Sequence, residues 1–230
     1  MIKEKNSEFK DMLTGLGVFF LYLIMMSSPN EFLLLFGKNY NNLSLLGKQV
    51  YLTLYECLLL IIIVFIYRKD VIPNFKDYIK NIISYLKKYI KYWFIIIVLM
   101  ILSSELITMF TTTNTSENQR IIIEEFKKVP IYILIATILI APILEELVFR
   151  LSFKKIFKHT NILFILFSGF MFGFIHVIGS LTSLIDLLFI IPYSIPGFIF
   201  AYTYSKSNNI FVPISIHLLH NLIMLLIQVL

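Results

Sequence analysis

Charged side chains are scarce in this sequence. Only 15% of its 230 residues are Asp, Glu, Lys or Arg, against 58% hydrophobic residues and a mean hydropathy of +0.84. Soluble domains carry about 25% charged residues. Most of the length is taken by apolar stretches of the roughly 20 residues that a helix needs to cross a bilayer. The sequence therefore excludes a separate soluble domain and predicts one all-α, multi-pass membrane domain over residues 1–230.

Cysteine and linker sequences are scarce too. The single cysteine, Cys57, lies in an apolar run and excludes a disulfide framework. No internal repeat and no Gly/Ser-rich or Pro-rich linker divides the chain. The charges before the first apolar run balance, and Ser27-Ser28-Pro29 after it is a poor cleavage site. We therefore expect an uncleaved first span rather than a signal peptide.

The basic residues gather between the apolar segments. The net charge of +6 therefore indicates cytoplasmic loops beside lipid rather than a nucleic-acid partner. Segments 68–91 and 150–160 are dominated by Lys and Arg, whereas 111–129 mixes both signs. The sequence thus predicts a cell-membrane protein with a cytoplasmic N-terminus. The expected spans, about seven and between six and eight, are 12–28, 49–67, 92–110, 130–150, 161–179, 182–204 and 210–229.

Residues 74–92 show a different pattern. Apolar residues recur at helical spacing, and five lysines fill most of the remaining arc. This pattern predicts an amphipathic helix in the membrane interface, with its lysines toward anionic headgroups. The alternative is a solvated, charged linker.

Ionisable and amide side chains recur deep in three of the expected spans. An ionisable group in hydrocarbon is costly and persists where it is paired, hydrated or functional. We expect these side chains to meet near the middle of the bilayer, around a water-filled cavity open to the cytoplasm. They are Glu145, Glu146 and Arg150 on one span, His176 on the next, and His217 with Asn221 on the last.

Two carboxylates are adjacent on the fourth span. Glu146 and Arg150 are four residues apart, which suits a charge pair on one helix face. Glu145 then remains free for chemistry, and its alternative is a structural or protonated carboxylate. Pro142 is expected to kink or locally unwind this helix and so open room for substrate.

A histidine in a span is often only a hydrogen-bonded core group. His176, however, follows small residues that allow close helix approach, and a carboxylate is available on the preceding span. A Glu–His pair can hold and deprotonate a water. We therefore favour a catalytic His176 paired with Glu145. The small residues are Ser168, Gly169 and Gly173.

The last span carries His217 and Asn221, four residues apart and therefore on one face. Their N–H groups suit an anionic tetrahedral intermediate. His220 is an alternative to His217, whereas His159, among loop lysines, is expected on the solvated surface. The other acids within spans lack a comparable partner and are expected to be structural. They are Glu56, Glu105 and Asp186.

At these positions the sequence resembles the CAAX protease and bacteriocin-processing family, also called the Abi family of intramembrane proteases. The family pattern is E-E-x-x-x-R, then F-x-x-x-H, then H-x-x-x-N/D on successive core helices. The resemblance covers about residues 130–225, a catalytic core, and leaves 1–129 as N-terminal helices. It implies an endopeptidase that hydrolyses peptide or membrane-protein substrates at or within the membrane. The motifs stand here as Glu145-Glu146 with Arg150, Phe172 with His176, and His217 with Asn221.

The resemblance also implies roles for these residues, and bacterial relatives are linked to peptide maturation and to bacteriocin immunity. Glu145 and His176 would activate water, and His217 and Asn221 would stabilise the oxyanion. The residues that would shape the site are Glu146, Arg150 and Phe172.

No cofactor is favoured, because no H-E-x-x-H helix is present. The alternative is a zinc ion held by Glu145, His176 and His217. Two other functions remain open. One is a non-catalytic immunity or regulatory protein that retains the protease fold. The other is a proton transporter, which the lack of inverted repeats disfavours.

Overall fold

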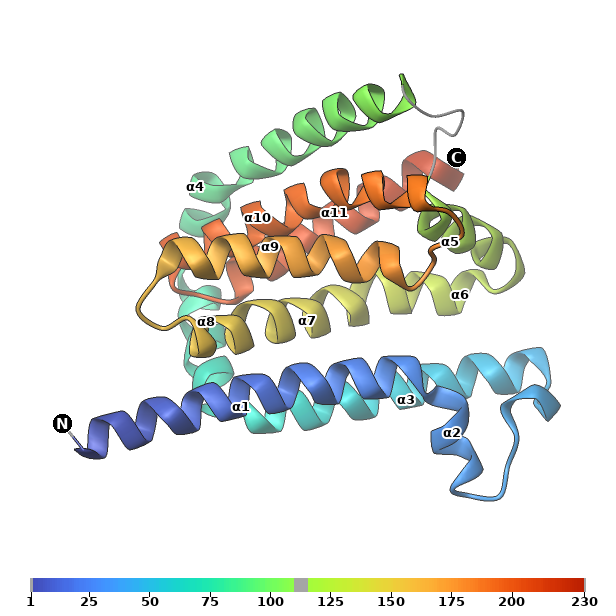
Figure 1. Cartoon of the computed structure of the whole chain (residues 1–230), viewed down its shortest axis with the longest axis horizontal. Helices are drawn as coiled ribbons and strands as arrows, with labels where there is room; N and C mark the ends of the chain where they lie inside the picture. Colours follow the sequence, from blue (N-terminus) through green and yellow to red (C-terminus); the bar gives the residue numbers. More distant parts are fainter. Residues whose placement is uncertain (1, 110–115, 230) are drawn as a thin grey trace.

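The computed structural model describes residues 2–109 and 116–229, and within these residues the only regular secondary structure is helical, with no strand. Seven of the described helices are long and apolar enough to cross a membrane, which confirms the predicted multi-pass all-α bundle (Figure 1). They are α1 (Ile2–Ser27), α3 (Leu45–Ile66), α4 (Arg68–Thr108), the run α6 to α8 (Pro130–Ile156), α9 (Asn161–Ile178), η4 with α10 (Leu184–Ser207) and α11 (Phe211–Val229). The shorter helices are α2 (Pro29–Leu34), η1 (Tyr40–Asn42) and α5 (Glu117–Lys128).

The bundle has two distinct ends. One end, called the basic end below, gathers the N-terminus, the α3–α4 junction and the α8–α9 and α10–α11 connections (Figure 1). There Lys155 pairs with Asp70 at 3.2 Å and with Asp11 at 3.5 Å, and Lys158 pairs with Glu8 at 3.7 Å. The other end, called the α5 end, holds α2, α5 and the C-terminus. The chain therefore alternates between the two ends as expected.

Two details of that expectation change. Arg150, which was counted with the basic segment 150–160, lies inside the helical run and is fully buried. The helix continues to Ile156, so only the lysines beyond Arg150 belong to the basic end. The Thr- and Asn-rich start of segment 111–129, residues 111–115, lies outside the described residues.

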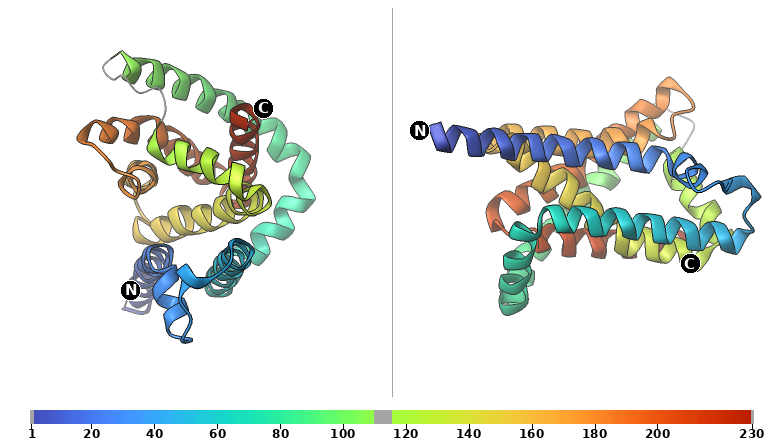
Figure 2. Two further views of the ribbon diagram at one scale, coloured as in Figure 1. Left: turned by 90° about the vertical axis from the view of Figure 1, so that its right-hand side faces the viewer. Right: turned by 90° about the horizontal axis from the view of Figure 1, so that it is seen from below.

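Helix α4 joins the expected interfacial helix to the third span. It bends at Asn81, whose backbone is not helical (φ −116°, ψ 15°), because the Asn81 side chain donates to the Asp77 carbonyl at 3.1 Å and carboxylate at 2.8 Å. The part before the bend crosses the basic end, and the part after it runs toward the α5 end (Figures 1 and 2). The first part is fixed by Asn209, which donates to the Asp77 carboxylate at 2.8 Å. The predicted segment 74–92 is therefore helical, but the bend at Asn81 divides it, so it is not one continuous amphipathic helix as expected. Its place in the membrane interface stays a prediction.

Helices α9 and α10 pack at very short range. A Cβ atom on Gly173 would lie 2.6 Å from the backbone nitrogen of Ser194, and one on Gly197 would lie 2.7 Å from the carbonyl oxygen of Gly169. Only glycine allows such contacts, so the predicted close approach around residues 168–173 is confirmed.

The fourth span is not a regular α-helix. Two wide-turned π-helical segments, η2 (Leu134–Ile140) and η3 (Leu147–Ser152), flank the short helix α7 (Ala141–Glu146). Pro142 lacks the N–H that would bond to the preceding turn, which accounts for part of this irregularity, as predicted. Glu145 and Glu146 are therefore the last two residues of a short regular helix, α7, which lies between the π-helical segments η2 and η3.

Candidate active site

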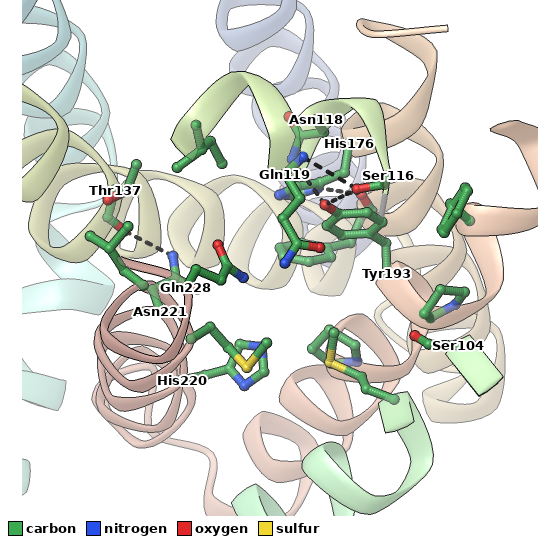
Figure 3. A pocket seen from close by; sticks show the side chains of 18 of the residues that line it. Ser104, Ser116, Asn118, Gln119, Thr137, His176, Tyr193, His220, Asn221 and Gln228 are labelled. Carbon is green, nitrogen blue, oxygen red and sulfur yellow. Dashed lines mark hydrogen bonds between the residues drawn. The ribbon is translucent and has the colours of Figure 1, made fainter. Parts of the chain in front are cut away.

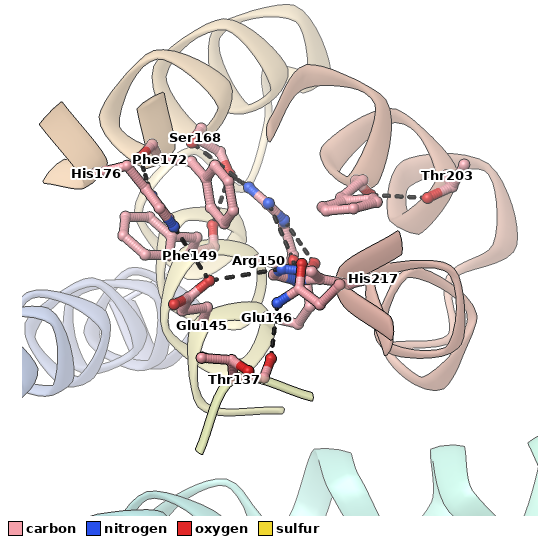
Figure 4. Close-up of polar contacts among 12 residues, drawn as sticks. Thr137, Glu145, Glu146, Phe149, Arg150, Ser168, Phe172, His176, Thr203 and His217 are labelled. Carbon is pink, nitrogen blue, oxygen red and sulfur yellow. Dashed lines mark hydrogen bonds and ion pairs between the residues drawn. The ribbon is translucent and has the colours of Figure 1, made fainter. Parts of the chain in front are cut away.

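Glu145 lies between two histidines from other helices. Its Oε2 atom is 3.8 Å from Nε2 of His176 on α9 and 3.7 Å from Nε2 of His217 on α11 (Figure 4). The same oxygen is buried and has no hydrogen-bond partner. The distances are too long for direct hydrogen bonds but suit a shared water. The expected meeting of the fourth, fifth and seventh spans at this carboxylate is therefore present.

Hydrogen bonds at the far side of each ring fix the histidine tautomers. His176 Nδ1 is 2.7 Å from the Phe172 carbonyl, and His217 Nδ1 is 3.0 Å from the Glu146 carboxylate. Both partners only accept, so both Nδ1 atoms carry the proton. In the neutral rings the two Nε2 atoms are then acceptors, like the oxygen of Glu145 that they face. Three acceptors converge without a donor, which calls for a water, a proton or a cation between them.

Glu146 and Arg150 form the predicted pair, and both are fully buried. Arg150 donates to the two Glu146 oxygens at 2.7 and 3.1 Å and, through Nη1, to the Ser168 hydroxyl at 2.5 Å. Glu146 in turn accepts from His217. The pair therefore links the fourth span to α9 through Ser168 and orients the ring of His217.

Phe172 occupies the centre of this cluster. Its ring centroid is 4.4 Å from that of His176 and 5.5 Å from that of His217, and the Arg150 guanidinium carbon lies 5.2 Å from it. Phe200 stacks on the other face of the site, 4.6 Å from the ring of His217. Aromatic rings thus hold both imidazoles and exclude water behind them.

A cavity of about 170 Å³ opens beside the two histidines (Figure 3). His176, His217 and Asn221 form one wall, and Glu145 reaches it only as the neighbour of the two rings. The remaining lining comes from the ends of α4 and α11, the start of α10, α5 and η2, all at the α5 end. The cavity therefore lies toward the α5 end, opposite to the basic end, and its expected opening to the cytoplasm stays a prediction.

Asn221 is partly engaged. Its Nδ2 donates one N–H to the carbonyl of Thr137 in the π-helical segment η2, at 2.8 Å, which leaves its second N–H available. His220 also lines the cavity, with a buried Nδ1 that has no partner, but His217 is the histidine that faces the carboxylates. His220 therefore does not replace His217 in this cluster.

Tyr193 lies beside His176 and was not identified from the sequence. Its ring stacks on the imidazole with centroids 5.3 Å apart, and its hydroxyl meets Ser116 Oγ at 2.8 Å and Asn118 Nδ2 at 3.2 Å. Tyr193 thus connects α5 to a histidine of the site. No motif marks a tyrosine in an apolar span for such a contact.

The other polar residues fall outside the cluster. Glu56 accepts from the hydroxyl of Tyr132 at 2.8 Å, and Asp186 caps η4 by accepting from the backbone of Ser183 at 2.7 Å. His159 is exposed and lies 3.2 Å from Glu8. Among the residues that the structure describes, no group of three His, Cys, Asp or Glu is arranged to hold a metal ion.

The fold and the cluster define a class: a multi-pass helical membrane protein with a buried carboxylate facing two histidines. Residues 127–223 match the family model described as type II CAAX prenyl endopeptidase Rce1-like. This match confirms the predicted CAAX protease and bacteriocin-processing family over that segment, which contains all three motifs.

A curated relative covers part of the chain. The protein named "Putative membrane peptidase YdiL" from Bacillus subtilis (strain 168) is 34% identical over 122 residues, or 52% of this chain. The match spans 46% of that relative, so the chain covers about half of its length. No solved structure matches the chain.

Proposed function

We propose that this protein is an intramembrane endopeptidase that hydrolyses peptides or membrane proteins without a covalent intermediate. The observation that carries the proposal is the buried, unpartnered Oε2 of Glu145, within 3.8 Å of both imidazoles. A water between Glu145 and His176 donates its two protons to these two acceptors and points a lone pair outward. That is the arrangement of an activated nucleophile.

In the proposed reaction Glu145 is the general base. The water oxygen attacks the carbonyl carbon of the scissile peptide bond, and its proton passes to Glu145 while His176 holds the water in place. The carbonyl π bond becomes a C–O⁻ group. Glu145 then returns its proton to the leaving nitrogen as the C–O⁻ group re-forms the carbonyl and the C–N bond breaks, which releases an acid and an amine.

The oxyanion needs hydrogen-bond donors, and Asn221 has one free N–H. His217 can donate from Nε2 only when both of its nitrogens are protonated, because Nδ1 already donates to Glu146. This adds a condition to the expected role of His217, which was to donate an N–H to the oxyanion.

The test is cleavage of single-span model peptides by the full-length protein in proteoliposomes. We expect Glu145→Gln and His176→Ala each to lower turnover at least about 100-fold, the usual contribution of a general base. The matched control is Glu56→Gln. Glu56 is also a glutamate within a span, but it accepts a hydrogen bond from Tyr132 and lies outside the site. It should keep wild-type turnover.

Two results would contradict the proposal. One is wild-type turnover by both site variants. The other is a cellular phenotype that survives Glu145→Gln, which would favour the non-catalytic immunity or regulatory alternative.

We propose further that the site works without a metal ion. The three converging acceptors are also the chemistry of a His₂Glu zinc site, and Nδ1 bonds such as those of His176 and His217 are common behind zinc ligands. The arrangement of the described residues, however, suits a water more directly. Turnover should persist after exhaustive chelation, and a loss restored by zinc alone would reverse this choice.

The cytoplasmic N-terminus is likewise a proposal, supported by the lysines of the basic end. In a Cys57→Ser background, a membrane-impermeant maleimide should label Glu124→Cys in intact cells and Lys158→Cys only after permeabilisation. The opposite pattern would invert the bundle.

A further inference from the structure

Among the residues that the structure describes, the lining of the cavity next to the site contains no Asp, Glu, Lys or Arg. Its lining mixes apolar side chains with hydroxyl, imidazole and carboxamide groups. A charged substrate side chain entering it would meet no opposite charge and would lose its hydration. The cavity is also far larger than the roughly 10–15 Å³ that one water needs, so it has room for more than the nucleophile.

Two glutamines stand out in this lining. The chain has three glutamines in all, and Gln119 on α5 and Gln228 near the end of α11 both line the cavity. Their side chains project into it (Figure 3) and make no hydrogen bond with any other described residue. By contrast, the cavity's two asparagines, Asn118 and Asn221, are engaged with Tyr193 and Thr137. With respect to residues 2–109 and 116–229, the two glutamine amides therefore have hydrogen-bonding groups available for what enters the cavity.

A carboxamide matches a peptide group, because each has an N–H donor and a carbonyl acceptor. A protease must unwind a helical substrate to reach its carbonyl carbon. In lipid, each backbone group freed in this way is unsatisfied at a cost of several kcal/mol. Side-chain amides beside the reacting residues can replace the lost hydrogen bonds without introducing charge.

We propose that Gln119 and Gln228 form a subsite that binds the main chain of an unwound, uncharged substrate segment. This inference rests on the proposed peptidase function and names its substrate class. The same cavity is bounded by His176, His217 and Asn221, so a segment held by the glutamines also contacts the site.

The position of Gln119 is fixed relative to His176. The Gln119 backbone N–H donates to Ser116 Oγ at 3.2 Å, Ser116 bonds to the Tyr193 hydroxyl, and the Tyr193 ring stacks on His176. The subsite and the site therefore keep a constant spacing, as recognition of a main chain on both sides of one bond requires.

The experiment measures binding separately from cleavage. Full-length Glu145→Gln protein in proteoliposomes is titrated with a dye-labelled, capped leucine–alanine pentapeptide. A second probe is the same peptide with one backbone nitrogen methylated, and a third has one leucine replaced by lysine. Protein-free vesicles correct for partition into lipid.

We expect N-methylation to weaken binding about 5- to 10-fold, the worth of one hydrogen bond of about 1–1.4 kcal/mol. Gln119→Leu and Gln228→Leu should weaken the unmethylated probe by a similar factor, and the double variant should bind both probes equally. The lysine probe should bind more weakly than the parent. Gln49→Leu, the third glutamine, is the matched control and should change nothing.

Equal binding of the methylated and parent probes, or undiminished binding by the double variant, would overturn the subsite. Its failure differs from failure of the proposed function. Glutamine-dependent binding without any Glu145-dependent cleavage would leave the subsite standing and remove the peptidase. Glu145-dependent cleavage by a protein whose binding does not depend on the glutamines would support the peptidase and remove the subsite.

Discussion

The four spans after residue 129 are packed against one another far more than the three before it. In each of these four spans, between 33% and 44% of the most hydrophobic 18-residue stretch is buried inside the protein, against 11–17% for α1, α3 and α4. The family match, 127–223, and all the site residues lie in the packed half. The polar site residues of this membrane protein therefore lie where neighbouring helices pack densely around them and shield them. The N-terminal helices leave most of their surface facing outward from that core.

Two Arg–Glu pairs give the strongest test of this difference. Arg150→Met should lower the free energy of unfolding by about 3–5 kcal/mol, because it leaves Glu146 charged, buried and unpaired. Arg120→Met breaks the pair with Glu117, whose arginine is 63% exposed, and should leave the free energy of unfolding almost unchanged. Unfolding of the purified variants in detergent measures both. Equal losses would show that burial does not distinguish the two pairs.

Two glycines sharpen the comparison at the backbone. Gly173→Ala should destabilise the protein by about 1–3 kcal/mol, because its Cβ would press on the backbone of Ser194. Gly17→Ala on α1 meets nothing within 4 Å and should raise stability by about 0.5–1 kcal/mol through helix propensity. The same detergent unfolding assay applies. A stable Gly173→Ala protein would mean that α9 and α10 can separate freely.

The smallest expected effect concerns tyrosine hydroxyls. Tyr193→Phe keeps the ring on His176 but frees Ser116 and Asn118, so we expect turnover to fall about 2- to 10-fold. Tyr55→Phe removes a hydroxyl bond to the Met25 carbonyl in the N-terminal half and should leave turnover unchanged. Peptide cleavage in proteoliposomes measures both. An equal fall in the two variants would show a general loss of stability rather than loosened positioning of His176.

Much of the site followed from spacing along single helices. The pair of Glu146 with Arg150 needs only a separation of four residues, and the close approach near Gly173 needs only small side chains. The end of the bundle at which the cavity lies did not follow, because it depends on how the ends of α4, α5 and α10 come together. The connection from Tyr193 to α5 was missed for the same reason, since its partners are 75 and 77 residues away.

Composition and periodicity by themselves determined that this chain is a bundle of about seven membrane-spanning helices with acid, imidazole and amide groups inside it. In lipid each backbone group must be hydrogen-bonded within its helix, and each polar side chain must be paired, hydrated or functional. Only the tertiary structure decided that Glu145 faces both imidazoles. Hydrogen bonds from the two Nδ1 atoms to the Phe172 carbonyl and to Glu146 orient the rings, so that both Nε2 atoms point toward Glu145. Such convergence depends on helix rotation and contact across three spans, which no local pattern encodes.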